Sequence, residues 1–407
     1  MSFSQRRSNL VRAIAALAIV SAVVAGVACG GDGVASPAQT SSPDTRSPAG
    51  AVSCGTSKAI FSVSPVALSD VVGWVPLGNM APSGHTFPTD HQYLYVSDAN
   101  GVTPRREVNL VAPGNIVVTR AHLGTTNPGA VTDYTLEFSP CAETYAQFGH
   151  VLTIAPALLS QLGAFDQDCN TYSPAPGATV STCQTKVVAV PVSAGALIGT
   201  AGGANPHSLA LDFSLWDARV AALTFANPAH WPASNDRFDQ FHVVPASDYF
   251  AEPLRSQVAA RLGSYDGKAV RTAAPVGGTI GVDVSGTAMG FWFNPSQPTY
   301  PETPHLAIAP DNVDPSRIDF SVGLSLPGWN RGWVSFAPVT AGKVNRSPSQ
   351  ITADGTIYCF ESPGAWVLLL QVIDASTLRL ESRSTGLLDC AAGQPWTFTG
   401  AAFDFKR

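Results

Sequence analysis

Turn-forming residues interrupt this chain so often that long regular elements are excluded from most of it. Its 407 residues include 36 glycines and 32 prolines, and the apolar segments between them are short and alternate with polar residues. Alternation of this kind is typical of strands with one buried face, and glycine or proline marks the turns between strands. We therefore expect a mostly β protein with few short helices.

Two segments carry helix signals. Pro156–Leu162 is followed by Gly163, and Pro253–Leu262 is followed by Gly263. Proline is favoured in the first turn of a helix, and glycine is favoured just past its end. We expect a short helix in each segment.

The first 28 residues have the order of a secretory signal. Three arginines within the first 12 residues precede the apolar run Ala13–Val27, which ends at small residues before Cys29. This order directs export, and the run is shorter than the roughly 20 residues that span a bilayer permanently. We predict that residues 1–28 are removed and that the rest of the chain is exported.

A lipid anchor is predicted at Cys29. The stretch Ala-Gly-Val-Ala-Cys-Gly-Gly at residues 25–31 resembles a bacterial lipobox, although Gly26 stands where a branched aliphatic residue is usual. The resemblance implies a lipoprotein held to a membrane, in the periplasm or on the cell surface. An ordinary cleavage site that releases a soluble protein is the alternative. Residues 29–55 begin rich in Gly, Ser, Thr, Pro and Ala, and we expect a flexible tether there.

The other six cysteines form an even set, which suits disulfides in an oxidising compartment. Six cysteines allow fifteen pairings, so the sequence leaves the connectivity open. Short loops favour two of the pairs, and the third follows from them: Cys169 with Cys183, Cys359 with Cys390, and Cys54 with Cys141.

Charge and motifs argue against nucleic-acid and nucleotide partners. Without the three arginines of the signal, 20 basic residues face 29 acidic ones, a net charge of −9. No basic patch appears, so nucleic-acid binding is not expected. No dinucleotide fingerprint or phosphate-binding loop follows a strand, and no Gly-x-Ser-x-Gly motif is present. We expect neither a nucleotide cofactor nor a serine nucleophile.

Length predicts two domains. The roughly 355 residues beyond the tether exceed what one hydrophobic core usually serves. We place the junction near residue 245, just before the second predicted helix. Residues 56–245 would form the first β domain, and residues 246–407 would form a β-sandwich or barrel of unknown role.

Histidine and aspartate gather at three places in the first domain. His85, Asp90 and His91 lie within seven residues, immediately before a strand-like segment, His150 lies on an apolar segment, and Asp212 lies in an alternating strand. Imidazole and carboxylate are the ligands that zinc takes when it is used for hydrolysis. A hydrogen-bonded loop and a core histidine are the alternatives.

The order of these pieces resembles the lysostaphin-like (LytM-type) zinc endopeptidases over about residues 72–220. The resemblance runs through the His-Asp segment, Val-Ala-Pro-Gly-Asn-Ile-Val-Val at residues 111–118, Asp-Tyr-Thr-Leu at 133–136, Phe-Gly-His-Val at 148–151 and Leu-Asp-Phe at 211–213. It implies a small antiparallel β core of the duplicated-hybrid-motif type. It also implies one zinc ion and cleavage of peptidoglycan peptides.

The resemblance also implies residue roles. His85 and Asp90 match the first metal-binding motif, in which the family has three intervening residues and this chain has four. His91 is the competing ligand if the register shifts. His150 matches the histidine that assists the water in catalysis.

The last motif departs from the family. Asp212 stands where a metal-binding histidine belongs, and carboxylate oxygen is a legitimate zinc ligand. Ala210 stands where a second assisting histidine belongs, and its methyl group cannot polarise a water.

Three functions follow as hypotheses. The first is a diverged peptidase-like domain that has lost turnover and binds peptidoglycan or an envelope protein as a scaffold. The second is an active zinc endopeptidase acting on cell-wall peptides. The third is a secreted carbohydrate- or surface-binding β protein, because Trp292, Trp329, Trp333 and Tyr300 lie in segments that suit sugar stacking. Core packing is the alternative for these aromatic residues.

Overall fold

The computed structural model describes residues 51–96, 106–126, 131–172, 179–202, 209–231, 240–299, 302–387 and 389–407. Within them the chain is mostly β, as expected, with two α-helices: α2 (Pro156–Leu162) and α3 (Leu254–Ala259). Four short 3-10 helices are η2 (Pro228–His230), η3 (Ala246–Tyr249), η4 (Pro348–Gln350) and η5 (Ala391–Gly393). None of the helices in these ranges has the length and apolarity to cross a bilayer. The predicted signal, Cys29 and most of the tether lie outside the described residues.

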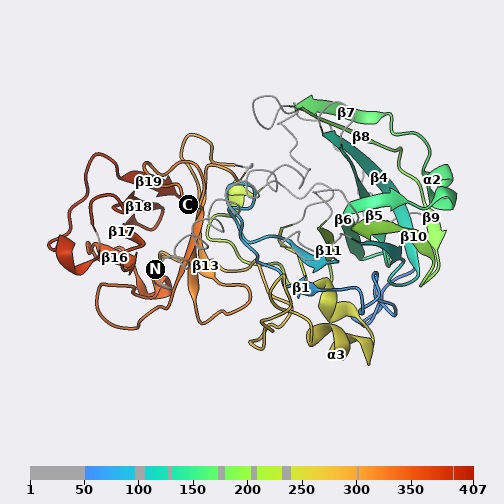
Figure 1. The fold of residues 1–407 in the computed structure, drawn as a ribbon, viewed down its shortest axis with the longest axis horizontal. Helices are drawn as coiled ribbons and strands as arrows, with labels where there is room; N and C mark the ends of the chain where they lie inside the picture. The colour runs from blue at the N-terminus through green and yellow to red at the C-terminus, as the bar shows by residue number, and fades with distance from the viewer. Residues whose placement is uncertain are drawn as a thin grey trace, which may run out of the picture.

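An antiparallel sheet of eleven strands forms the first body, drawn in blue and green in Figure 1. The main order is β1-β2-β11-β6-β5-β4-β8-β7, with β10 joining β3 to β6 and β9 pairing with β4. The strands are β1 (Gly73–Val75), β2 (His91–Tyr95), β3 (Glu107–Val111), β4 (Ile116–Thr126), β5 (Val131–Ser139), β6 (Thr144–Ile154), β7 (Gln167–Tyr172), β8 (Val180–Gln184), β9 (Val190–Val192), β10 (Leu197–Gly202) and β11 (Ala210–Asp217).

Alternation along β11 separates the core from the opposite face of the sheet. Leu211, Phe213 and Leu215 enter the first hydrophobic core, where the ring of Phe213 lies 4.7 Å from that of Phe148. Successive strand residues point to opposite faces, so Ala210, Asp212 and Ser214 share the other face. The strand is buried on both sides. Its second face must therefore hold buried polar groups.

The first core extends past residue 245, where we expected the domain junction. Tyr249, Phe250, Val258 and Leu262 belong to this core, and Leu262 forms an isolated bridge with Trp74 of β1. The helix signal was read correctly, but α3 packs back onto the preceding sheet and does not open the next body. A boundary at residue 245 would cut through packed aromatic residues.

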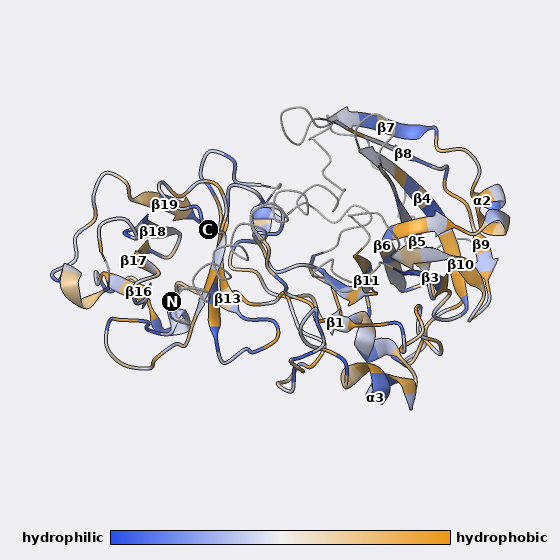
Figure 2. Ribbon diagram, viewed as in Figure 1, coloured by the Kyte–Doolittle hydropathy of each residue, from blue (hydrophilic) through white to orange (hydrophobic). Residues whose placement is uncertain are grey.

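Two four-stranded antiparallel sheets form the second body, a β-sandwich drawn in orange and red in Figure 1. The core between the sheets includes Phe320, Phe336 and Phe360, with the Phe360 ring 4.8 Å from Phe320 and 5.1 Å from Phe336. Figure 2 shows β13 as largely hydrophobic, in contrast to the hydrophilic outer strand β7. The strands are β12 (Gly290–Trp292), β13 (Leu306–Pro310), β14 (Ile318–Val322), β15 (Trp333–Phe336), β16 (Tyr358–Ser362), β17 (Trp366–Asp374), β18 (Thr377–Ser382) and β19 (Phe403–Lys406).

A cluster of aromatic side chains forms the contact between the two bodies. Phe87, from the turn before β2, lies 5.0 Å from the ring of Phe291 and 5.1 Å from that of Phe293, and it stacks on His305 at 5.3 Å. Its backbone N–H donates to Glu302 Oε2 at 2.8 Å. The turn that carries His85 and Asp90 is thereby fastened to the sandwich.

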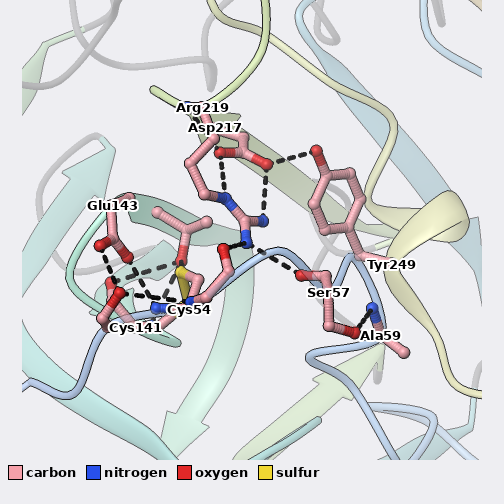
Figure 3. The surroundings of a disulfide bond; sticks show 11 residues. Cys54, Ser57, Ala59, Cys141, Glu143, Asp217, Arg219 and Tyr249 are labelled. Carbon is pink, nitrogen blue, oxygen red and sulfur yellow. Dashed lines mark hydrogen bonds and ion pairs between the residues drawn. A yellow bond between two sulfur atoms is a disulfide. The ribbon is translucent and has the colours of Figure 1, made fainter.

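Three disulfides pair the six cysteines as the loop lengths predicted: Cys54 with Cys141, Cys169 with Cys183, and Cys359 with Cys390. The first of them joins Cys54 to the turn between β5 and β6 (Figure 3). Glu143 accepts hydrogen bonds from the Cys54 N–H and the Ser53 hydroxyl, both at 2.7 Å. Residues 53–55 therefore belong to the folded body, and the tether predicted over residues 29–55 is too long at this end.

A buried ion pair fixes the segment that follows. Arg219 forms a bidentate pair with Asp217 and donates to the carbonyl oxygens of Gly55 and Ser57 at 3.2 and 2.9 Å (Figure 3). The Tyr249 hydroxyl donates to the same carboxylate at 2.6 Å. Burial alone would raise the pKa of Asp217, but the hydrogen bonds from Arg219 and Tyr249 outweigh it and hold that pKa below its ordinary value.

Replacing Arg407 with methionine is expected to destabilise the sandwich strongly. Its guanidinium lies 3.1 Å from Asp283 and 4.2 Å from the centre of the Trp292 ring, and both charged side chains are 4% exposed. The variant leaves a buried carboxylate without its cation, which costs about 3–5 kcal/mol of unfolding free energy. Denaturation with guanidinium chloride, followed by tryptophan fluorescence, measures the loss of unfolding free energy.

The matched control is Arg379→Met, which breaks a pair with Asp404 whose side chains are 39% and 38% exposed. An exposed pair contributes about 0–1 kcal/mol. Equal losses in the two variants would contradict the role given to burial.

His305 is expected to make stability depend on pH. Burial lowers the pKa of this fully buried histidine to about 4, although its hydrogen bond to the Thr299 carbonyl opposes the shift. Between pH 6.5 and pH 4 the unfolded chain therefore binds a proton that the folded chain excludes, and stability falls as the pH falls. The loss is about 3 kcal/mol.

Urea unfolding of the protein and of His305→Gln at pH 7 and pH 4 checks this. The stability advantage of histidine over glutamine should shrink by that amount at pH 4. An advantage that is the same at both pH values would show that His305 does not titrate in this way.

Candidate functional site

Three adjacent strands place His91, Asp212 and His150 on one face of the first sheet. In the register, Asp212 of β11 lies opposite Tyr93 of β2 on one side and Gly149 of β6 on the other. Paired residues in an antiparallel sheet share a face, as do residues two apart on one strand. His91 therefore lies on the same face as Asp212, and His150 reaches it from the next strand.

The two imidazoles converge on one carboxylate oxygen. His91 Nε2 lies 3.6 Å from Asp212 Oδ2, and His150 Nε2 lies 3.5 Å from the same atom. The three side chains are only 8–10% exposed. Both distances are longer than an ordinary N–H···O hydrogen bond of 2.7–3.2 Å.

Each imidazole is oriented from behind by a second carboxylate. His91 Nδ1 lies 3.0 Å from Asp90 Oδ1, and His150 Nδ1 lies 2.8 Å from Asp133 Oδ2. Asp90 is held in turn by Gln240, whose Nε2 donates to Oδ2 at 3.0 Å. An ionised carboxylate only accepts hydrogen bonds, so it directs the proton to Nδ1. In a neutral imidazole this leaves the Nε2 lone pair facing Asp212.

The backbone of β6 allows Asp212 and His150 to lie close together. A Cβ atom at Gly149 would lie 3.1 Å from Asp212 Oδ2 and 3.2 Å from Asp212 Cβ, so a side chain at this position would crowd the carboxylate. His150 has a φ of 58°, in the left-handed region, where the pairing register of β5 and β6 is interrupted. Bulges of this kind re-aim a side chain and are frequent next to active sites.

The predicted site residues occupy different places in the structure. It brings His91, His150 and Asp212 together at the centre. Asp90 lies behind His91, where it orients the imidazole. His85 lies at the edge of the centre, with its ring 5.4 Å from that of His91 and its backbone paired with Ala81.

Four contributors were missed by sequence reasoning. Asp133 belongs to the Asp-Tyr-Thr-Leu segment of the resemblance, but no role at the site was predicted for it. Gln240 is 150 residues from its partner Asp90, so no local spacing could reveal it. Tyr93 and Tyr95 follow His91 at strand spacing on the same face, a signal that was present in the sequence. Burial, the charge of Asp212 and the neighbouring Tyr265 raise the pKa of Tyr95 to about 12.

Polar side chains continue from the centre across the same face. His91 lies opposite Ser214, Ser214 opposite Gln147, and Gln147 opposite Glu137, which pairs with His122 Nε2. This row crosses β2, β11, β6 and β5, a span of about 14 Å at the usual strand spacing. Within this row Ser214 and Glu137 are buried, with 5% and 3% of their surface exposed.

A second group of potential metal ligands, found among the described residues, is Cys54, Cys141 and Glu143. The two sulfurs are joined in a disulfide, and the carboxylate accepts two hydrogen bonds (Figure 3). A disulfide sulfur is not the thiolate that binds metals. This group serves the fold.

The aromatic residues of the sandwich divide between core and surface. Trp292 is fully buried and donates from Nε1 to the Ala288 carbonyl at 2.9 Å, so it packs in the core. Trp329 is half-buried, Trp333 is 47% exposed, and Tyr300 lies outside the described residues. Sugar stacking by these residues stays a prediction.

Comparison of the chain with protein-family models, with curated proteins and with solved structures finds no match. The likeness to LytM-type endopeptidases stays a prediction from its motifs. Function is therefore inferred from the residues of the site and their geometry.

Proposed function

We propose that the first body is a zinc-dependent peptidase that acts on cell-wall peptides outside the cytoplasm. The observation that carries the proposal is the convergence of His91 Nε2 and His150 Nε2 on Asp212 Oδ2 at 3.6 and 3.5 Å. Two ligands of a tetrahedral zinc ion, each about 2.1 Å from it, lie about 3.4 Å apart. Two histidines and one carboxylate are also a ligand set of catalytic zinc, which leaves one position open.

Charge supports a cation at this place. Asp90, Asp133 and Asp212 gather around the two imidazoles, and none of their side chains is more than 20% exposed. Buried carboxylates are costly unless a positive charge offsets them. A divalent ion held by Asp212 and the two imidazoles would offset this charge.

The residues divide into roles. His91, His150 and Asp212 would hold the ion, which when bound would supply Lewis-acid chemistry and lower the pKa of water. Asp90 and Asp133 orient the imidazoles. His85 is the imidazole left to accept a proton as the oxygen of water adds to the amide carbon, and to return it to the amine when the C–N bond breaks.

Location follows from the sequence and is compatible with the fold. Three disulfides suit an exported protein. Lipid attachment at Cys29, and with it a place in the periplasm or on the cell surface, is part of the proposal.

A second candidate function is binding of cell-wall peptide or an envelope protein without turnover. Ala210 favours it, because the resemblance places a water-assisting imidazole there, and the structure gives a buried methyl group packed with Val75 and Tyr93. The two candidates share the metal site and differ in hydrolysis.

Zinc content is expected to depend on Asp212. Mass spectrometry of the protein, purified without chelator or nickel affinity, should find about one zinc per chain. Asp212→Asn should lose it, because the central ligand loses its charge. Asp404→Asn, which alters a surface pair of the sandwich, is the control and should retain the metal.

Hydrolysis separates the two candidates. Zinc-loaded protein incubated with purified peptidoglycan should release new amino groups. Zinc without release would favour the binding candidate. Absence of zinc from both the unaltered protein and the control would contradict both.

Asp133→Asn is expected to weaken zinc binding about 10- to 100-fold, because loss of an orienting carboxylate costs that much in metal affinity. Competition with a chromophoric chelator gives the dissociation constant. Asp168→Asn, outside the site, should leave the constant unchanged. Equal affinity in Asp133→Asn and the unaltered protein would show that Asp133 does not support a metal ligand.

A further inference from the structure

Tyr95 lies next to Ala210, the position at which the resemblance predicts a second assisting histidine. In the register, Tyr95 of β2 is directly opposite Ala210 of β11 on one side and Gly73 of β1 on the other. Both of these cross-strand neighbours are small. Its side chain is half-buried and packs against the cluster of Val75, Tyr93 and Ala210.

The phenol is within reach of the metal-binding carboxylate. Tyr95 and Asp212 are diagonal neighbours on one face, because Asp212 pairs with Tyr93, two residues from Tyr95. Diagonal neighbours in an antiparallel sheet lie about 7–8 Å apart, a span that aromatic side chains bridge. The charge of Asp212 is also one of the influences on the Tyr95 hydroxyl.

We propose that the Tyr95 hydroxyl donates a hydrogen bond to the carbonyl or anionic oxygen of a ligand held at the His91–Asp212–His150 centre. It would take the place left by Ala210 as a donor toward developing negative charge. This inference rests on the proposed function, and it favours turnover over binding alone.

The chemistry of a phenol suits this role. Tyrosine has an ordinary pKa near 10 and keeps its proton at neutral pH, so it acts as a donor and not as a base. Packing against Val75 and Ala210 would be served equally by phenylalanine. Removal of the hydroxyl alone therefore separates donation from packing.

The test is anion affinity of the cobalt-substituted protein. Cobalt(II) replaces zinc and its visible absorption reports ligand binding, with acetohydroxamate as the probe. Tyr95→Phe should still bind cobalt, and it should bind acetohydroxamate about 10- to 100-fold more weakly, as expected for one hydrogen bond to a charged group. Tyr265→Phe is the matched control. It removes the hydroxyl from a ring that lies 5.9 Å from that of Tyr95, and it should keep the affinity within about twofold.

Three results would overturn the inference. Unchanged acetohydroxamate affinity in Tyr95→Phe would show that the hydroxyl does not contact the ligand. Loss of cobalt from Tyr95→Phe would assign the phenol to the support of Asp212 instead. Failure of the unaltered protein to bind cobalt would remove the proposed metal site itself, and this inference with it.

Discussion

The insertion of Phe87 between the two bodies is the contact on which the candidate site depends. The ring lies against Phe291, Phe293 and His305 of the sandwich, and its N–H is held by Glu302. Aromatic pairs contribute about 0.5–1.5 kcal/mol each beyond the area they bury. Several such contacts on one residue fix the turn between β1 and β2. Because β2 begins at His91, the same contacts fix the first imidazole of the centre.

The sandwich thus has a structural role in the site although it supplies none of its central residues. The turn at residues 77–90 is also closed by its own backbone, since the N–H of Thr89 donates to Asn79 and that of Gly78 donates to Thr89. A turn stabilised on both sides holds an imidazole at a defined angle, which a metal centre needs. The second body therefore supports the turn that leads into β2, the strand that carries the first imidazole of the candidate site.

Alternation and turn residues predicted the strands and helices well. Burial that depends on contacts between distant segments could not be predicted from them. The alternation in Thr377–Ser382 predicts a strand with Leu378 and Leu380 on its buried face, and both are fully buried in β18. The same alternation places Glu381 on the outward face, yet it is only 1% exposed, and Thr399 donates to it from both its N–H and its hydroxyl. Alternation assigns a side chain to a face of its strand and does not show whether another segment covers that face.

The same limit applies to the candidate site. Residue type and motif order were enough to predict His91, Asp212 and His150 as site residues. The separate roles of Asp90 and His91 follow only from the structure, in which Asp90 contacts His91 Nδ1 and Asp212 lies near His91 Nε2. His150 is in the left-handed region, at a cost of about 1–2 kcal/mol for a residue with a side chain. Strain of this kind persists where the surroundings over-determine it and is concentrated at functional sites. At His150 the Asp133 contact provides that constraint, and the strain turns Nε2 toward Asp212. A histidine with only a packing role would need neither the bulge nor the buried carboxylate.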